Sequence, residues 1–162
     1  MAETLDVTSM LPNTFEPKRK FRWILRIEGI DAFLITTAAR PKYTTGEVEI
    51  GWINSTRYLA GKTKFEPMEI TLHDAIAPAG AQQVMEWIRL QFESVSGRAG
   101  YADFYKRDMQ LCMLDSIGTV CELWDIKGAW LTSVDYGDLD HAAEDVQMIS
   151  LSIRFDNAVL QF

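Results

Sequence analysis

The residue types that most often carry catalysis are few and scattered in this chain of 162 residues. Its two histidines, His73 and His141, are far apart in the sequence, and neither has other ligating residues at a metal-site spacing. No serine stands in a G-x-S-x-G motif, and no G-x-x-x-x-G-K-[ST] loop is present. The sequence therefore predicts that both histidines are incidental surface residues, and that the protein is not an enzyme and uses no metal and no cofactor.

Two clusters of like charge could bind a charged partner. The segment Asp135 to Asp145 is acidic, but its spacing does not match an EF-hand and no glycine occupies the turn position, so a solvated loop is the simpler interpretation. The run Lys18-Arg19-Lys20 could contact nucleic acid, yet the formal net charge is −7, from 23 acidic and 16 basic residues. Because phosphate binding needs a basic surface, we interpret this run as a solvated strand edge.

The cysteines and the N-terminus indicate the compartment in which the protein is made. Cys112 and Cys121 are too few for a disulfide framework and lie in apolar, strand-like runs, which predicts two reduced core thiols. A bridge would require their strands to pair with the two positions opposed. The N-terminus lacks the pattern of a signal peptide, and no apolar stretch approaches the roughly 20 residues of a membrane helix. We therefore expect no membrane anchor and synthesis in a cytoplasm.

The hydrophobic pattern indicates one mainly β domain. Residues 1–17 contain two prolines and little periodicity, which predicts a flexible N-terminal arm, followed by a single domain over residues 18–162. Alternation of apolar and polar residues predicts six to eight strands, mostly antiparallel because the linkers are too short for crossovers. The predicted strands cover residues 21–28, 32–39, 44–52, 65–73, 105–115, 119–127 and 149–155.

Two connections and one helix complete the prediction. Gly29-Ile30-Asp31 is expected to join the first two strands as a hairpin, and residues 54–64 form either a long hairpin arm or a mobile loop. A helix is expected between Pro78, which suits a first turn, and Gly97, which suits the position after the last turn. Its predicted buried face consists of Ala81, Val84, Met85, Ile88, Phe92 and Val95.

Two segments resemble the tail tube proteins of contractile-tailed bacteriophages. In residues 51–75, a glycine and an asparagine lead into a long hairpin, an Ala-Gly pair follows, and an apolar strand ends in Asp74 before the helix. In residues 125–156, the matching features are Lys127, Gly128, Trp130, Thr132 and Val134, then an acidic loop and a closing strand of alternating residues. The resemblance extends in order over about residues 18–157.

The resemblance implies a fold and a function. The fold is mainly β (α+β): an antiparallel β-sandwich or open barrel with one flanking α-helix and a long hairpin loop from about Gly46 to Lys64. The function is that of a structural subunit, whose homohexameric rings stack into a tube inside a contractile sheath in the virion tail. The implied partners are further copies, the sheath, the baseplate and tail terminator proteins, and the tape measure protein and DNA that pass through the lumen without specific binding.

Two other functions remain open at this stage. A baseplate-proximal tube initiator, or the inner tube protein of a type VI secretion or contractile injection system, shares the fold and the stacking chemistry. A soluble ligand-binding β domain is disfavoured, because catalytic groups do not converge in the sequence.

Three sets of residues are hypothesised to carry the assembly. Glutamates on the polar sides of their strands would line the lumen and repel DNA phosphates: Glu47, Glu49 and Glu69. Trp87 and Leu90, which point away from the predicted buried face of the helix, would contact the sheath or a neighbouring subunit. Contacts between rings and subunits would come from the hairpin: Gly51, Asn54, Arg57, Tyr58, Leu59 and Lys62.

Overall fold

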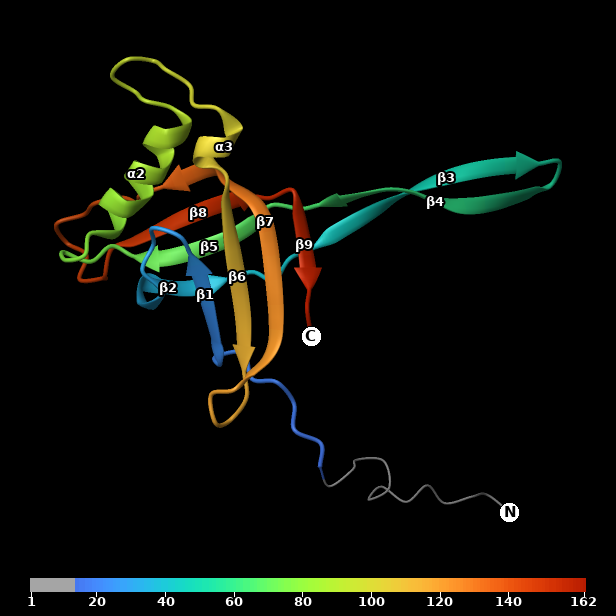
Figure 1. Cartoon of the computed structure of the whole chain (residues 1–162), viewed down its shortest axis with the longest axis horizontal. Coiled ribbons are helices and arrows are strands. Elements are labelled where there is room, and N and C mark those ends of the chain that lie inside the picture. Colours follow the sequence, from blue (N-terminus) through green and yellow to red (C-terminus); the bar gives the residue numbers. More distant parts are fainter. Residues whose placement is uncertain (1–13) are drawn as a thin grey trace.

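The computed structural model of the protein describes residues 14–162 (Figure 1). Most of the predicted arm, residues 1–17, therefore lies outside the described residues, and the domain boundary at residue 18 stays a prediction. The helical elements are the 3-10 turn η1 (Ala32–Leu34) and the helices α2 (Gly80–Gln91) and α3 (Ala102–Tyr105). The strands are β1 (Trp23–Ile27), β2 (Ile35–Ala38), β3 (Tyr43–Trp52), β4 (Ser55–Phe65), β5 (Met68–His73), β6 (Arg107–Leu114), β7 (Val120–Asp135), β8 (Met148–Arg154) and β9 (Asn157–Leu160).

Seven of these strands form one sheet that folds over on itself at β7. The order is β1-β6-β7-β8-β5-β2, β9 also pairs with β7, and every pairing is antiparallel. The long strand β7 turns at Gly128, where φ is +67°. At this φ an L side chain is strained, and a Cβ would lie 2.2 Å from the Asp156 carboxylate, so the position favours glycine. We define layer A as β1, β6, β9 and the first half of β7. Layer B consists of β2, β5, β8 and the second half of β7.

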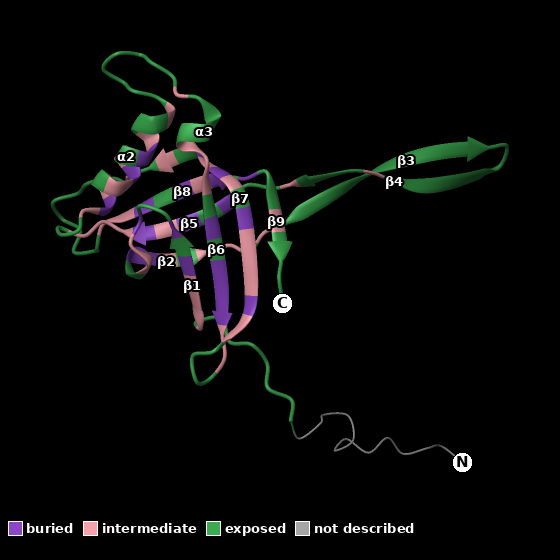
Figure 2. Cartoon of the chain, in the orientation of Figure 1, coloured by how far each residue is buried: buried purple, intermediate pink, exposed green. Residues whose placement is uncertain are grey.

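The core lies between these two layers (Figure 2). Alternate residues of each strand point inward, as period-2 alternation requires. This confirms the predicted antiparallel sandwich or open barrel, and the sheet does not close into a barrel within the chain. The most deeply buried aliphatic side chains are Leu25, Leu111 and Ile126 from layer A, and Ile70, Leu72, Ile149, Leu151 and Ile153 from layer B.

Strands β3 and β4 form a separate two-stranded hairpin that projects far from the two layers (Figure 1). Every residue of β3 is exposed, and in β4 only Gly61 and Phe65 are half-buried. At its base, the Phe65 ring packs against Tyr43 and against Phe155 of the body, with ring centroids 6.3 and 5.4 Å apart. Of the two alternatives for residues 54–64, the long hairpin arm is therefore confirmed.

The prediction that the first two strands form a hairpin is wrong. β1 pairs with β6 in layer A, and β2 pairs with β5 in layer B. Gly29, with φ of +80°, turns the chain after β1, and η1 then carries it across from one layer to the other. The described residues also contain more strands than the six to eight expected, because β9 follows β8 as a separate element.

The predicted orientation of the helix is also wrong in one respect that matters for function. Trp87 is buried, with 1% of its surface exposed, and its Nε1 donates a hydrogen bond to the Tyr105 backbone oxygen at 2.7 Å. The Arg107 guanidinium covers the Trp87 ring at 4.9 Å. Because α2 ends at Gln91, the apolar residues at 92 and 95 do not belong to the helix and do not define its buried face. The buried stripe follows Gly80, Val84 and Trp87.

The remaining individual predictions have mixed outcomes. Cys112 is buried and Cys121 half-buried, and both are free thiols, as expected. His141 is exposed as predicted, but His73 is half-buried and its Nδ1 is buried without a hydrogen-bond partner. The acidic segment from Asp135 is an exposed loop. Within residues 14–162, no helix is long and apolar enough to cross a membrane.

Candidate assembly surfaces

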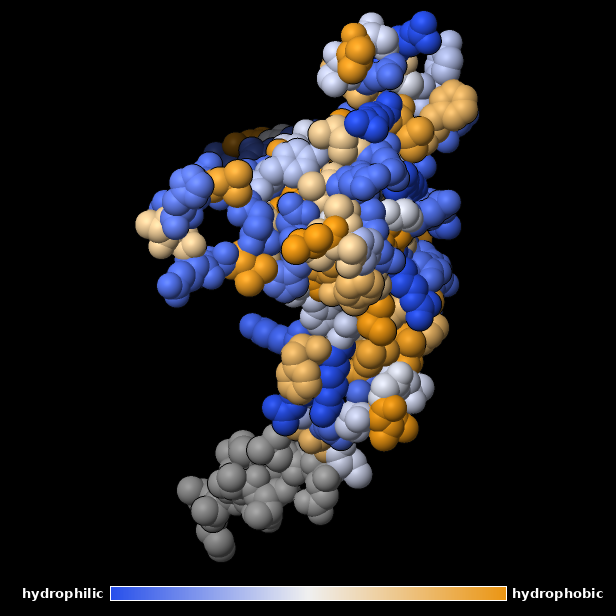
Figure 3. Space-filling model, turned by 90° about the vertical axis from the view of Figure 1, so that its left-hand side faces the viewer, coloured by the Kyte–Doolittle hydropathy of each residue, from blue (hydrophilic) through white to orange (hydrophobic). Residues whose placement is uncertain are grey.

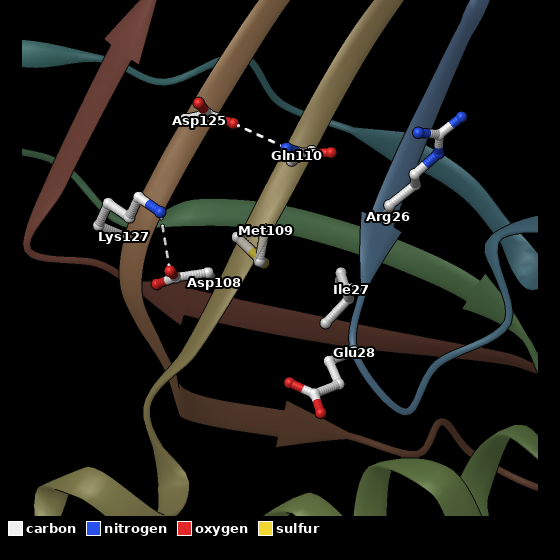
Figure 4. A pocket seen from close by; sticks show the side chains of 8 residues that line it. All are labelled: Arg26, Ile27, Glu28, Asp108, Met109, Gln110, Asp125 and Lys127. Atoms are coloured by element: carbon white, nitrogen blue, oxygen red, sulfur yellow. Dashed lines mark hydrogen bonds and ion pairs between the residues drawn. The ribbon is translucent and has the colours of Figure 1, made fainter.

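Two pairs of polar side chains bond to each other on the outer face of layer A, and the polar groups there do not point to a common centre (Figure 4). Gln110 Nε2 donates to Asp125 at 3.0 Å, and Lys127 Nζ donates to Asp108 at 2.9 Å. The Lys127 hydrogen bond, followed by one from the Gly128 backbone N–H, lowers the pKa of Asp108. In the described part of the chain, no group of three or more His, Cys, Asp or Glu could hold a metal ion. This face carries charges of both signs, and its labelled side chains do not converge on one point.

The hairpin has two unlike faces because its strands are in register near the tip. Val48 lies opposite Leu59, Ile50 opposite Arg57, and the pairs on one face alternate with those on the other. Four side chains of one face are apolar and between 46% and 74% exposed, and Ser55 and Arg57 lie on the same face. The members of this apolar face are Val48, Ile50, Trp52 and Leu59.

An isolated two-stranded hairpin is at best marginally stable in water. An exposed, contiguous apolar face on such a hairpin marks a surface that is covered in an assembly. Gly46 and Gly61 shape the hairpin, since a Cβ on Gly61 would lie 3.0 Å from the Gly46 backbone oxygen where the register shifts between Thr45 and Glu47. The hairpin direction therefore depends on backbone contact at these two glycines.

The hairpin tip holds a residue in a strained conformation. Ile53 has φ of +47° and is 90% exposed. A β-branched residue in this region is uncommon, because its Cβ approaches the backbone too closely. Such strain persists mainly where a side chain has a function. The tip thus presents a large apolar group at the far end of the molecule.

The structure places the six predicted contact residues along this one hairpin. Arg57 and Leu59 lie on its apolar face, Gly51 and Tyr58 on the opposite face, Asn54 in the turn, and Lys62 beside the register shift. The prediction did not include the apolar residues of β3, Val48, Ile50 and Trp52, or Ile53 at the tip. The alternation of Val48 and Ile50 with glutamates was the signal that could have identified them.

The three predicted lumen glutamates do not form one cluster within the subunit. Glu47 and Glu49 lie on the polar face of the hairpin, opposite Ala60 and Tyr58. Glu69 lies in β5, exposed on the outer face of layer B and opposite Ser152 of β8. Any common surface of these carboxylates would have to arise between subunits.

Layer A has two borders that could pair with another chain. Within the described residues, β1 pairs with β6 alone and β9 pairs with β7 alone. The Gln161 N–H donates to the Leu123 oxygen at 2.8 Å, so by antiparallel alternation the N–H groups of Ala158 and Leu160 point to the free border. Unpaired borders of this kind are templates for strand addition.

The second group of exposed apolar side chains lies around the C-terminal end of α2. Figure 3 shows apolar side chains among hydrophilic ones on the side of the molecule that carries α2, including its top, where the loop between α2 and α3 lies. Leu90 is 43% exposed, as its predicted outward position requires, whereas Trp87 does not contribute. The other exposed members of this group are Phe92, Val95, Tyr101 and Phe104.

Solved structures with this fold are components of contractile injection machines. The chain superposes on the tube terminating cap of the anti-feeding prophage with a TM-score of 0.74 and 16% identity, covering 97% of this chain and 99% of that chain. For the sheath-tube complex of an extracellular contractile injection system in its extended state, the TM-score is 0.63 and the identity 17%, covering 98% and 99%. A component of the anti-feeding prophage baseplate gives 0.69 and 12%, covering 91% and 97%. At these identities, the likeness defines the class of fold.

The sequence itself matches the family of the T4-like virus tail tube protein gp19 over residues 19–159, and the chain belongs to this family. One relative, the tail tube protein of Serratia phage KSP90, is 27% identical over 128 residues, which are 78% of this chain and 72% of that protein. The predicted resemblance is thereby confirmed. The protein is a structural subunit of a contractile-phage tail tube and a component of the virion tail.

Proposed function

We propose that copies of this chain join border to border into six-membered rings, and that the rings stack through the projecting hairpin. The observation that carries the proposal is a folded body with two free strand borders and a separate hairpin with an exposed apolar face. A role of this kind is structural rather than enzymatic. The number six comes from the family resemblance.

The strand order of layer A supports closure into a ring. From one border to the other the order is β9-β7-β6-β1, with each neighbour antiparallel. An even number of alternating strands brings β1 of one copy antiparallel to β9 of the next when the copies are related by rotation. Repeating this contact closes a continuous barrel and leaves no exposed border.

The length and the faces of the hairpin support stacking. Its strands have 10 and 11 residues, so at about 3.3 Å per residue the arm extends roughly 30 Å. We propose that its apolar face packs on a subunit of the next ring. The opposite face, with Glu47 and Glu49, then remains free to line the lumen.

We propose that Glu47, Glu49 and Glu69 make the lumen acidic, so that DNA and the tape measure protein pass without binding. Replacing all three with lysine should slow genome delivery and make tubes retain DNA at low salt, where screening is weak. Unchanged delivery together with unchanged DNA retention would reject the assignment.

The outer partners follow from the same arrangement. We propose that the sheath contacts the surface around Leu90, and that the baseplate and tail terminator proteins cap the two ends of the tube. Leu90→Ser should weaken sheath binding and leave bare tubes intact, with the exposed polar change Gln82→Ser on the same helix as the matched control. Normal sheath assembly on Leu90→Ser tubes would contradict this role.

Negative-stain microscopy of the purified full chain tests the assembly proposal. Wild-type protein should form long tubes, whereas isolated rings would favour the alternative role of a baseplate-proximal initiator, whose fold class the chain shares. Leu160→Pro removes an N–H that points to the free border, so it should yield folded subunits that form no rings. Leu160→Ala controls for the lost side chain and should still assemble. Tubes from the proline variant would contradict pairing at β9.

A further inference from the structure

One carboxylate of the protein is buried although no step of the assembly described so far uses it. Among residues 14–162, Glu122 is the charged residue that is buried, with 3% of its surface exposed. It lies in β7 opposite Met113 of β6, with its side chain on the inner side of layer A. Its carboxylate accepts hydrogen bonds from the Lys18 ammonium, the Arg40 guanidinium and Trp124 Nε1, the last at 2.6 Å.

The two cations come from segments outside the layers. Lys18 lies in the segment that leads into β1, and Arg40 lies between β2 and the first strand of the hairpin. Their side chains are 48% and 55% exposed, whereas that of Glu122 is 4% exposed. A single buried anion thus connects the N-terminal segment to the base of the hairpin.

Apolar packing alone does not hold these segments in place. An open groove runs beneath Lys18 and Arg40, lined by Trp23, Leu111 and Met113. The β4 end of the hairpin is anchored by Phe65 against Phe155. The β3 end is held by two backbone hydrogen bonds, Ala39 N–H to Glu69 and Glu66 N–H to Lys42, and by the Arg40 side chain. Without the ion pair, the direction of the β3 end would be set by fewer contacts.

The physical chemistry of the site favours a specific geometry over bulk stability. Burial raises the pKa of Glu122, but hydrogen bonds from Lys18, Arg40 and Trp124 outweigh it and lower the pKa to about 2. A buried ion pair adds little net stability compared with apolar side chains of similar size, and its best-attested use is to specify one arrangement. Here the specified arrangement is that of two segments that leave the body.

We infer that Glu122 is a positioning residue for tube assembly, which fixes the direction of the hairpin and of the N-terminal segment by holding Arg40 and Lys18. The inference rests on the proposed role of the hairpin in stacking. Free subunits then present the hairpin already in its docking orientation. Less conformational entropy is then lost on binding, so the affinity between rings is higher.

The test compares elongation of wild-type tube seeds by purified variants of the full chain. Glu122→Gln and Arg40→Met should raise the critical concentration about three- to tenfold, because freed side chains and a freed segment must be ordered on docking. Arg40→Lys keeps the charge and should recover most of the wild-type value. Lys106→Met removes an exposed ion pair, with Asp156 at 2.6 Å, that holds neither Arg40 nor Lys18, and it should leave elongation unchanged.

A further readout separates positioning from general stability. Amide hydrogen exchange should increase in residues 40–43 of Glu122→Gln but not in β8, whereas a general loss of stability would increase exchange in both segments. Equal elongation by Glu122→Gln, Arg40→Met and the wild type would overturn this inference alone. A wild-type chain that forms no tubes would reject the proposed function and this inference with it.

Discussion

The apolar face of the hairpin makes a quantitative prediction about stacking. Val48, Ile50 and Leu59 each remain between 46% and 49% exposed in the free subunit, so about half of each side chain is left to bury on docking. The perturbation is the triple change of these residues to serine. Because they lie on an arm outside the core, the unfolding midpoint of the subunit should change little.

Complete burial of such a side chain stabilises by about 1.5–3 kcal/mol, so the remaining half contributes about 0.8–1.5 kcal/mol per residue. Three residues then contribute about 2–4.5 kcal/mol to each hairpin contact. At about 1.4 kcal/mol per tenfold change, the critical concentration for elongation should rise by about 30- to 1,600-fold. The lower end is expected, because ordering the hairpin opposes docking.

The assay is seeded elongation followed by light scattering, with microscopy to count tubes. The matched control is the double serine variant of the opposite face, at Glu47 and Glu49, which changes β3 without touching the apolar face. This control should elongate within a few-fold of the wild type. If the apolar-face variant elongates as well as the control, the hairpin does not dock through this face and the reasoning fails.

Three further predictions concern single residues. Trp87→Phe should lower the free energy of unfolding by about 1–3 kcal/mol in chemical denaturation, because the Tyr105 oxygen loses its buried donor; an unchanged value would show that water replaces it. Ile53→Gly should leave the unfolding midpoint equal or slightly higher, because glycine relieves the left-handed strain. The critical concentration for elongation should nevertheless rise, because the tip loses its apolar group. Improved elongation would contradict a contact at the tip. The folded-state pKa of Glu122, about 2, lies below its ordinary value of 4.5, so its stabilisation is full above pH 4.5 and declines as pH falls towards 2. One pKa unit corresponds to about 1.4 kcal/mol, and the half-exposed cations reduce this value. The free energies of unfolding of the wild type and Glu122→Gln should therefore differ by about 2–3 kcal/mol at neutral pH and converge near pH 2. A difference that grows on acidification would refute this.

Much of the strand content could be predicted from residue patterns. In β8, Ile149, Leu151 and Ile153 alternate with polar residues, and the period of two in side-chain direction leaves one consistent element. The two strands of the β6–β7 pair were predicted for the same reason, over residues 105–115 and 119–127. Six residues of the hairpin that forms the candidate assembly surface were also predicted. The division of the hairpin into two faces depends on the register of β3 against β4, and alternation within a single strand does not reveal that register.

The sequence by itself determined the family, the antiparallel β character and the existence of a long hairpin, because these depend on local alternation and on ordered motifs along the chain. Only the tertiary structure decided which strands are neighbours: β1 and β2, adjacent in sequence, lie in different layers, where β1 pairs with β6 and β2 pairs with β5. It likewise buried Trp87 beneath Arg107 and brought Lys18 and Arg40 to Glu122. These contacts join residues far apart in the chain, and their free energy depends on burial and charge that exist only once the two layers have packed.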